Sequence, residues 1–144
     1  MSVKQLSVFA ENKNGSLFEI TKILADADID IRAFSIADTH SYGVLRLIVN
    51  NPRKAAFALS NAEKIVNVTD VVGVQIPDER GGLSCLLDVI MQNGIGVDYL
   101  YAFVSSKVGR AFVVLRVADN NSAEALLEAN GFKLLTDDDI KTGI

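Results

Sequence analysis

Two short corners of the sequence, Asn14-Gly15-Ser16-Leu17 and Arg80-Gly81-Gly82-Leu83, carry the residues best suited to binding chemistry. Each corner follows an alternating apolar run and precedes apolar residues at helical spacing. A helix that begins at such a corner presents backbone N–H groups that have no partner within the helix, and these groups can bind a small anion such as a carboxylate. The chemistry expected at both corners is therefore anion recognition.

Other side chains that could carry chemistry are few. The sequence has one cysteine, Cys85, and one histidine, His40, which excludes an internal disulfide and a Cys/His zinc site. Cys85 falls within an apolar helical pattern and is typical of a small core residue rather than a nucleophile. No carboxylate pair or metal-ligand spacing stands out, so we predict no catalytic residue, no metal site and no cofactor.

Composition and charge restrict the partners and the location of the protein. The net charge is -4 and the pI about 4.9, without a basic run, which argues against nucleic acid or an anionic membrane as a partner. No apolar run approaches the roughly 20 residues that span a bilayer, and Met1 to Gln5 lead directly into a strand pattern without a signal peptide. We therefore expect a cytoplasmic protein.

The first half of the chain has the order β-α-β-β-α-β. Leu6, Val8 and Ala10 alternate with their neighbours and predict a strand, and from Ser16 the apolar spacing becomes helical. Ser16, with Glu19 three residues later, fits a capping box. The predicted elements are a strand over 5–10, a helix over 16–28, strands over 29–37 and 44–49, a helix over 53–62 and a strand over 65–68.

The second half repeats this order from Val71. Subtracting 66 maps Gly81 on Gly15 and Leu83 on Leu17, and the offset becomes 68 after the third-strand turn. A closing strand is expected over 132–135, and Asp137-Asp138-Asp139 is expected to be a solvated tail. The pattern predicts an α+β fold of two ferredoxin-like βαββαβ modules, residues 1–70 and 71–144, packed side by side with one antiparallel sheet and helices on one face.

The duplicated pattern resembles the ACT domain, a small ligand-binding module of amino-acid-metabolism enzymes, here as two copies without a catalytic domain. The resemblance rests on the two glycine corners and on Ala27-Asp28-Ile29-Asp30-Ile31 and Asn93-Gly94-Ile95-Gly96-Val97, which are similar to the family's entry into its second strand. It implies that the modules pair through their second strands, 29–37 and 95–103, in an eight-stranded sheet with four helices on one face.

The resemblance also implies two ligand sites at the seam, each between the corner of one module and the second strand of the other. The first site would combine Asn12, Asn14, Gly15, Ser16 and Leu17 with Gly96 and Val97. The second would combine Asp78, Arg80, Gly81, Gly82 and Leu83 with Asp30 and Ile31. Because the second site has two carboxylates, it should be the better one and should prefer amino acids with a basic or strongly hydrogen-donating side chain. The glycines could also serve only a tight turn, and the aspartates could be merely solvated.

The function that the resemblance implies is non-catalytic and regulatory. A free amino acid would bind at the seam, and a partner enzyme of amino-acid metabolism would sense its presence in trans; a homodimer is compatible with this interpretation. Two alternatives stay open: a small enzyme on a ferredoxin-like scaffold, since fold does not determine function, and an assembly module without a ligand.

Overall fold

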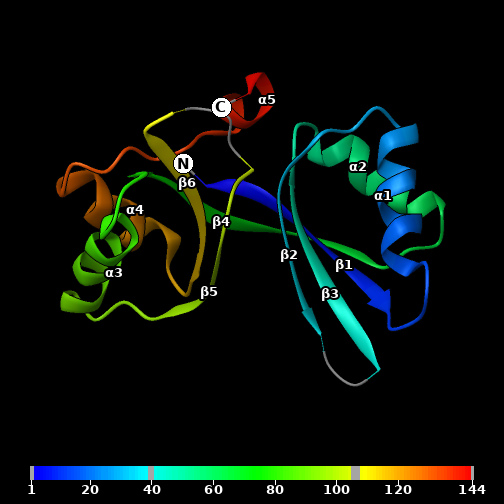
Figure 1. Ribbon diagram of the computed structural model, residues 1–144, viewed down its shortest axis with the longest axis horizontal. Helices are drawn as coiled ribbons and strands as arrows, with labels where there is room; N and C mark the ends of the chain where they lie inside the picture. Colours follow the sequence, from blue (N-terminus) through cyan, green and yellow to red (C-terminus); the bar gives the residue numbers. More distant parts are fainter. Residues whose placement is uncertain (1, 39–40, 105–107, 144) are drawn as a thin grey trace.

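The computed structural model of the chain describes residues 2–38, 41–104 and 108–143 (Figure 1). Both halves show the predicted order of strands and helices, and the α+β prediction is confirmed. The elements are β1 (Val3–Glu11), α1 (Ser16–Asp26), β2 (Ile31–Asp38), β3 (Tyr42–Val49), α2 (Pro52–Asn61), β4 (Val66–Pro77), α3 (Gly82–Gln92), β5 (Val97–Ala102), β6 (Arg110–Val117), α4 (Asn120–Ala129) and α5 (Asp137–Thr142).

The two halves share strand β4 within one antiparallel sheet of order β2-β3-β1-β4-β6-β5. Residues Val66 to Val71 of β4 pair with β1, and residues Val72 to Pro77 pair with β6. The sequence predicted two strands separated at Thr69 and Asp70, and that prediction is wrong. Each part of β4 has its own partner strand, so the backbone needs no turn between them.

The resemblance implied that the second strands of the two halves pair along their length, and this is wrong. The described sheet has six strands rather than eight. Strands β2 and β5 lie at the two ends of the sheet, which curls until they meet (Figure 1). Their contact is one bridge between Ala33 and Phe103, and the Val104 N–H donates to the Arg32 carbonyl at 2.9 Å. The continuous sheet that the sequence predicted is present, but strand β4 joins the two halves, and not a pairing of β2 with β5.

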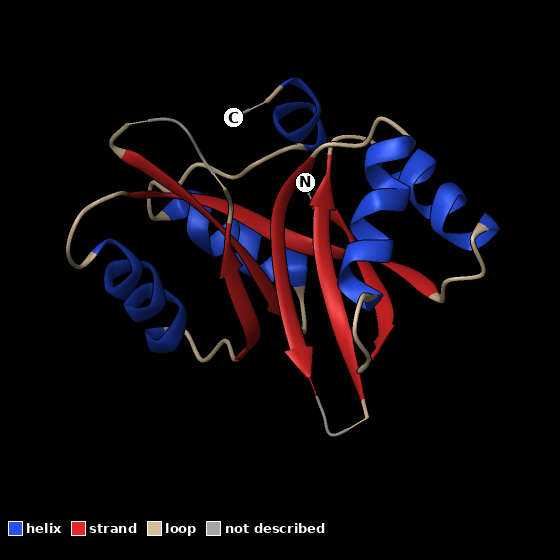
Figure 2. Cartoon of the chain, turned by 45° about the vertical axis from the view of Figure 1, so that its right-hand side comes forward, coloured by secondary structure: helices blue, strands red, loops and turns tan. Residues whose placement is uncertain are grey.

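The curled sheet has an outer and an inner face, each with its own core. Helices α1 and α2 cover the outer face of the first half, and α3 and α4 cover that of the second half (Figure 2). The inner face carries a third core, which joins the halves and consists of Val3, Ala33, Ile48, Val71, Tyr101, Phe103, Phe112, Val114, Leu135 and Ile140. Burial of apolar area on both faces stabilises two modules that would each be small for an independent fold.

The C-terminal segment differs from its prediction in two ways. The closing strand is reduced to a bridge between Val74 and Leu134, flanked by two backbone hydrogen bonds to β4. The expected solvated tail is wrong, because residues 137–142 form helix α5. Thr136 and Asp139 make a capping box at its start, and Ile140, 3% exposed, packs into the inner core.

None of the helices in the described ranges is both long enough and apolar enough to span a membrane.

Candidate functional site

The two glycine corners have nearly the same backbone geometry. Gly15 has φ 88° and Gly81 has φ 85°, a left-handed conformation that glycine adopts without steric penalty. Each glycine is the N-cap of the helix that follows, so Ser16 is the first residue of α1 and not its N-cap. The predicted capping box is therefore wrong. Its Glu19 carboxylate instead pairs with the Lys64 ammonium at 2.9 Å, which lowers the pKa of Glu19.

The starts of α1 and α3 differ from those of the other three helices in having no side-chain cap. The Asn51 side chain accepts a hydrogen bond from the Lys54 N–H at 3.2 Å at the start of α2. Asp119 accepts from the Ser122 hydroxyl and N–H at the start of α4, which lowers the pKa of Asp119. The Ser16 N–H donates to the Lys13 carbonyl at 3.3 Å, and the Gly82 N–H donates to the Glu79 carbonyl at 3.1 Å. The N–H groups that follow them in the first turns of α1 and α3 are thus the ones left for a ligand or for water.

A pocket of about 290 Å³ lies at the first corner. Its lining includes three residues of the predicted site, Asn12, Ser16 and Leu17. The Asn12 N–H donates to the Ser41 carbonyl at 3.2 Å, which joins the corner to the turn between β2 and β3. The complete lining is Ala10, Glu11, Asn12, Lys13, Ser16, Leu17, Ile36, Asp38 and Gly43.

The pocket combines groups of three kinds. The start of α1 supplies N–H groups, and the Asp38 side chain supplies a carboxylate. Leu17 and Ile36 supply apolar surface. Lys13 and Glu11 also line the pocket, but they pair with each other at 3.1 Å. Asp38 therefore offers the pocket a negative charge that the Lys13–Glu11 pair does not neutralise.

The topology explains why Asp38, and not Asp30, lies at this corner. Strands β1 and β2 both run antiparallel to β3, so they are parallel to each other and end at the same edge of the sheet. Gly43 of β3 is opposite both Ala10 of β1 and Asp38 of β2. Asp38 and Ile36 were not predicted from the sequence, although the β-α-β connection was a signal that could have found them.

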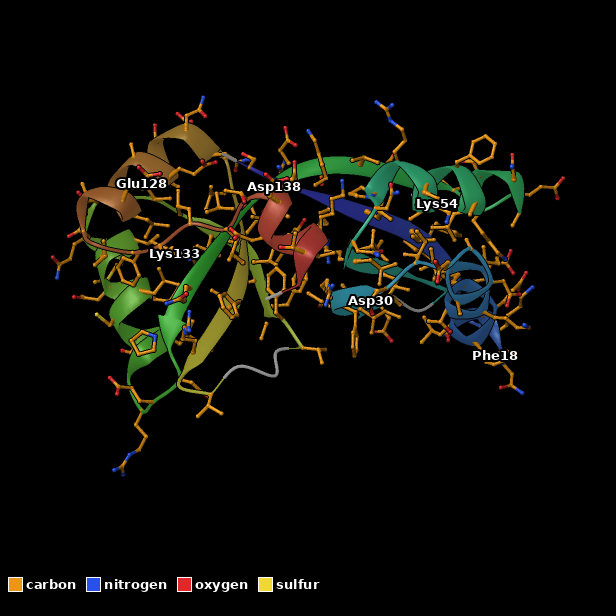
Figure 3. All side chains as sticks on the ribbon, turned by 90° about the horizontal axis from the view of Figure 1, so that it is seen from above. Phe18, Asp30, Lys54, Glu128, Lys133 and Asp138 are labelled. Carbon is orange, nitrogen blue, oxygen red and sulfur yellow. The ribbon has the colours of Figure 1, made fainter. Side chains whose placement is uncertain are left out.

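The structure does not bring the seam residues to the corners in the expected way. The Asp30 carboxylate pairs with the Arg32 guanidinium at 3.2 Å, and the Asp30 N–H donates to Asn50 Oδ1 at 2.9 Å. Figure 3 shows Asp30 beside the first half of the chain, and Figure 1 shows α1 and α3 on opposite sides of the molecule. Gly96 is exposed, and Val97 packs against the helix-covered core of the second half.

Leu17 and Ile31, both from the first half, line a second pocket of about 380 Å³. Helix α1, strand β2 and Val104 from the second half contribute to it. Its lining is Leu17, Thr21, Ile31, Phe34, Leu45, Leu47 and Val104. The seam near α1 is therefore an apolar groove, without a carboxylate in its lining for a ligand ammonium.

The second corner is tighter than the first. A Cβ atom on Gly82 would lie 2.3 Å from the Pro77 carbonyl oxygen, whereas Ser16 occupies the equivalent position in the first half. The Asp78 N–H donates to the Gly109 carbonyl at 3.2 Å, which repeats the Asn12–Ser41 bond. Residues 104–108 are the counterpart of the Asp38 turn and contain no carboxylate. Arg80 is exposed, and Leu83 is 39% exposed.

The described residues include no group of three or more His, Cys, Asp or Glu side chains that could hold a metal ion.

A family model described as an ACT domain pair matches residues 1–144. Comparison with curated proteins gave no match. The crystal structure of protein BT0572 from Bacteroides thetaiotaomicron has a TM-score of 0.92 and 36% identity, over 99% of this chain and 98% of that one.

The regulatory subunits of aspartate kinase from Thermus thermophilus, in its ligand-free form, and Thermus flavus have TM-scores of 0.66 and 0.61. Their identities are 16% and 14%, and each match covers 88% of both chains. At such identities the likeness to these two subunits shows a shared fold.

Proposed function

Because the chain belongs to the ACT domain pair family, we propose that it is a non-catalytic regulatory protein that binds a free amino acid and acts on an enzyme of amino-acid metabolism. The observation that carries this proposal is the pocket at the first corner. There the uncapped start of α1 and the Asp38 carboxylate line one cavity. An α-carboxylate and an α-ammonium need these two opposite partners.

In the proposed complex, the Leu17 N–H in the first turn of α1 holds the α-carboxylate, because the Ser16 N–H already donates to the Lys13 carbonyl. Gly15 allows the ligand to approach the backbone closely. Asp38 holds the α-ammonium, whereas the resemblance had placed Gly96 opposite this corner. Asn12 keeps its expected place beside the ligand, because it lines the pocket. The ligand side chain lies against Leu17 and Ile36, so we expect a small or aliphatic side chain.

The second corner is proposed as the weaker site, which reverses the order expected from the sequence. Asp78, Gly81 and Leu83 remain its candidate contacts, and Arg80 flanks them. Asp30, its expected partner, is paired with Arg32. An ammonium at this corner would therefore lack the charge-assisted partner that Asp38 supplies at the first corner.

Isothermal titration calorimetry against the standard amino acids tests the proposal. We expect one neutral aliphatic or small amino acid to bind with a stoichiometry of one per chain, and mass spectrometry to show the ligand unchanged after incubation. Turnover of the ligand would favour a small enzyme instead. Absence of binding for all of them would favour an assembly module.

Two matched carboxylate variants test the geometry. Asp38→Asn should weaken binding about tenfold or more, because a charge-assisted hydrogen bond is replaced by a neutral one. Asp30→Asn removes the same charge just before the opposite end of β2 and should leave affinity unchanged. Equal effects of the two variants would contradict the assignment of the ammonium to Asp38.

A further inference from the structure

Arg46 on β3 faces the inner side of the curled sheet, on the opposite face from the corner pocket. Its guanidinium carbon lies 3.8 Å from the centre of the Tyr99 ring, and its side chain is only partly exposed. Within the described ranges, Arg46 makes no ion pair and no hydrogen bond from its side chain. A partly buried guanidinium without an anion retains most of its donor capacity for a ligand.

Polar side chains flank Arg46 on the neighbouring strands. Arg46 lies opposite Ser35 of β2 and opposite Ser7 of β1, and Ser7 lies opposite Asn67 of β4. Directly opposite residues share a face of the sheet, so these four side chains form a row across four strands. We call Ser35, Arg46, Ser7 and Asn67 the polar row.

A buried glutamine fixes the tyrosine that stacks on Arg46. Gln5 is fully buried, and its Nε2 donates to the Tyr99 hydroxyl at 2.8 Å and more weakly to the Ser7 hydroxyl at 3.4 Å. Its Oε1 accepts from the Tyr101 hydroxyl at 2.6 Å. Tyr99 is therefore held in place, and the guanidinium that stacks on it is oriented before any ligand arrives.

Apolar side chains lie next to the polar row. Phe9 lies opposite Val44, its N–H donates to the Ile65 carbonyl at 3.0 Å, and its ring stacks on Tyr42 at 4.9 Å. Phe9 is 37% exposed and Ile65 is 65% exposed. The inner face thus places exposed aromatic and aliphatic surface beside an unpaired cation.

The duplication shows that the fold does not require a polar row. The sequence offsets of 66 before the turn and 68 after it map the row on Tyr101, Val114, Gly73 and Leu135. Tyr101, Val114 and Leu135 are buried in the inner core, where the Tyr101 hydroxyl donates to Gln5 Oε1 and the Leu135 N–H donates to the Gly73 carbonyl. A row that is buried and uncharged in one half and carries a partly exposed arginine in the other indicates a role other than support of the sheet.

We propose that the polar row is a second binding site, for a carboxylate attached to an aromatic or aliphatic group. Arg46 pairs with the carboxylate through its two-pronged guanidinium, and Ser7, Ser35 and Asn67 donate further hydrogen bonds. The apolar part of the ligand covers Phe9 and Val44. This site is independent of the proposed amino-acid site, because the two lie on opposite faces of the sheet and share no residue.

Titration with phenylacetate, followed by NMR of the backbone amides, tests this inference. We expect shifts at Ser7, Ser35, Arg46 and Asn67 that saturate at millimolar concentration, and a smaller effect from acetate and from benzyl alcohol, which each lack one part of the ligand. Stronger binding of inorganic phosphate than of phenylacetate would overturn the assignment to a carboxylate. Absence of saturable shifts with phenylacetate would overturn the site.

Variants separate a binding role from a structural one. Arg46→Gln should weaken phenylacetate binding at least about tenfold, and Arg46→Lys should weaken it less, since it keeps the charge but loses the two-pronged geometry. Arg53→Gln removes the same charge from α2 and should leave binding unchanged. If Arg46→Gln does not fold, Ser35→Ala decides the question through a severalfold loss. Unchanged phenylacetate affinity in these row variants would overturn the proposal.

Discussion

The two halves of the chain share their backbone plan and differ in the side chains that they place on it. Their helix-start glycines have φ values of 88° and 85°, and a loop N–H donates to a turn carbonyl at 3.2 Å in both halves. Around this common frame, the first half has Ser16, Asp38 and Arg46 where the second has Gly82, no carboxylate in residues 104–108, and Val114. The turn geometry follows from the fold, whereas the ligand-binding groups are free to differ between copies.

The largest effect is expected from making the two corners alike. Gly82→Ser copies Ser16 into the second half, but its Cβ would lie 2.3 Å from the Pro77 carbonyl oxygen. The backbone must shift, so we expect the free energy of unfolding to fall by about 3 kcal/mol. Urea denaturation measures this, with Ser16→Gly as the matched control. A loss below that of the control would show that the corners are interchangeable.

A smaller loss is expected from Tyr101→Phe, which weakens the joint between the halves. The variant leaves the buried Gln5 Oε1 without its 2.6 Å donor and should cost about 1–2 kcal/mol of unfolding free energy. Thermal or urea unfolding measures the loss. A change within experimental error would mean that this hydrogen bond does not hold the halves together.

The same tyrosine predicts a pH dependence. Burial raises the pKa of Tyr101 above its ordinary value of 10.0. Above that pH the unfolded chain releases the tyrosine proton and the folded chain keeps it, so this contribution to stability is complete below pH 10 and declines as the pH rises further. The slope of stability against pH in this range should be shallower in Tyr101→Phe than in the parent protein, and an unchanged slope would contradict this assignment.

The smallest effect separates capped from uncapped helix starts. Asn51→Ala removes the side chain that accepts from the Lys54 N–H, and should lower the free energy of unfolding by about 1 kcal/mol. Ser16→Ala removes no cap from α1 and should change stability less. Differential scanning calorimetry of both variants makes the comparison. A larger loss for Ser16→Ala would mean that its hydroxyl stabilises the corner after all.

The sequence predicted the features that depend on local pattern. Alternating and helical spacing located the elements, and the repeat of Gly15 at Gly81 located both corners. Asp38 was missed because its place depends on strand direction across the sheet, and the joint in β4 was missed because valines continue through Val71 and Val72 without a turn signal. Helix α5 was missed because Ile140 is a single apolar residue in an acidic stretch. The burial of Ile140 depends on its contacts with the inner core, which residues distant in the sequence form.

The central claim is that an amino acid binds at the first corner, between the start of α1 and Asp38. The most direct test is an NMR titration of the full chain with the amino acid that calorimetry selects. We expect the Ser16, Leu17 and Asp38 amides to shift at lower ligand concentration than those of Gly82 and Leu83. In the Asp38→Asn variant, the amides of the first corner should no longer shift before those of the second. Shifts that begin at the second corner, or that occur around Asp30 and not around Asp38, would contradict the claim.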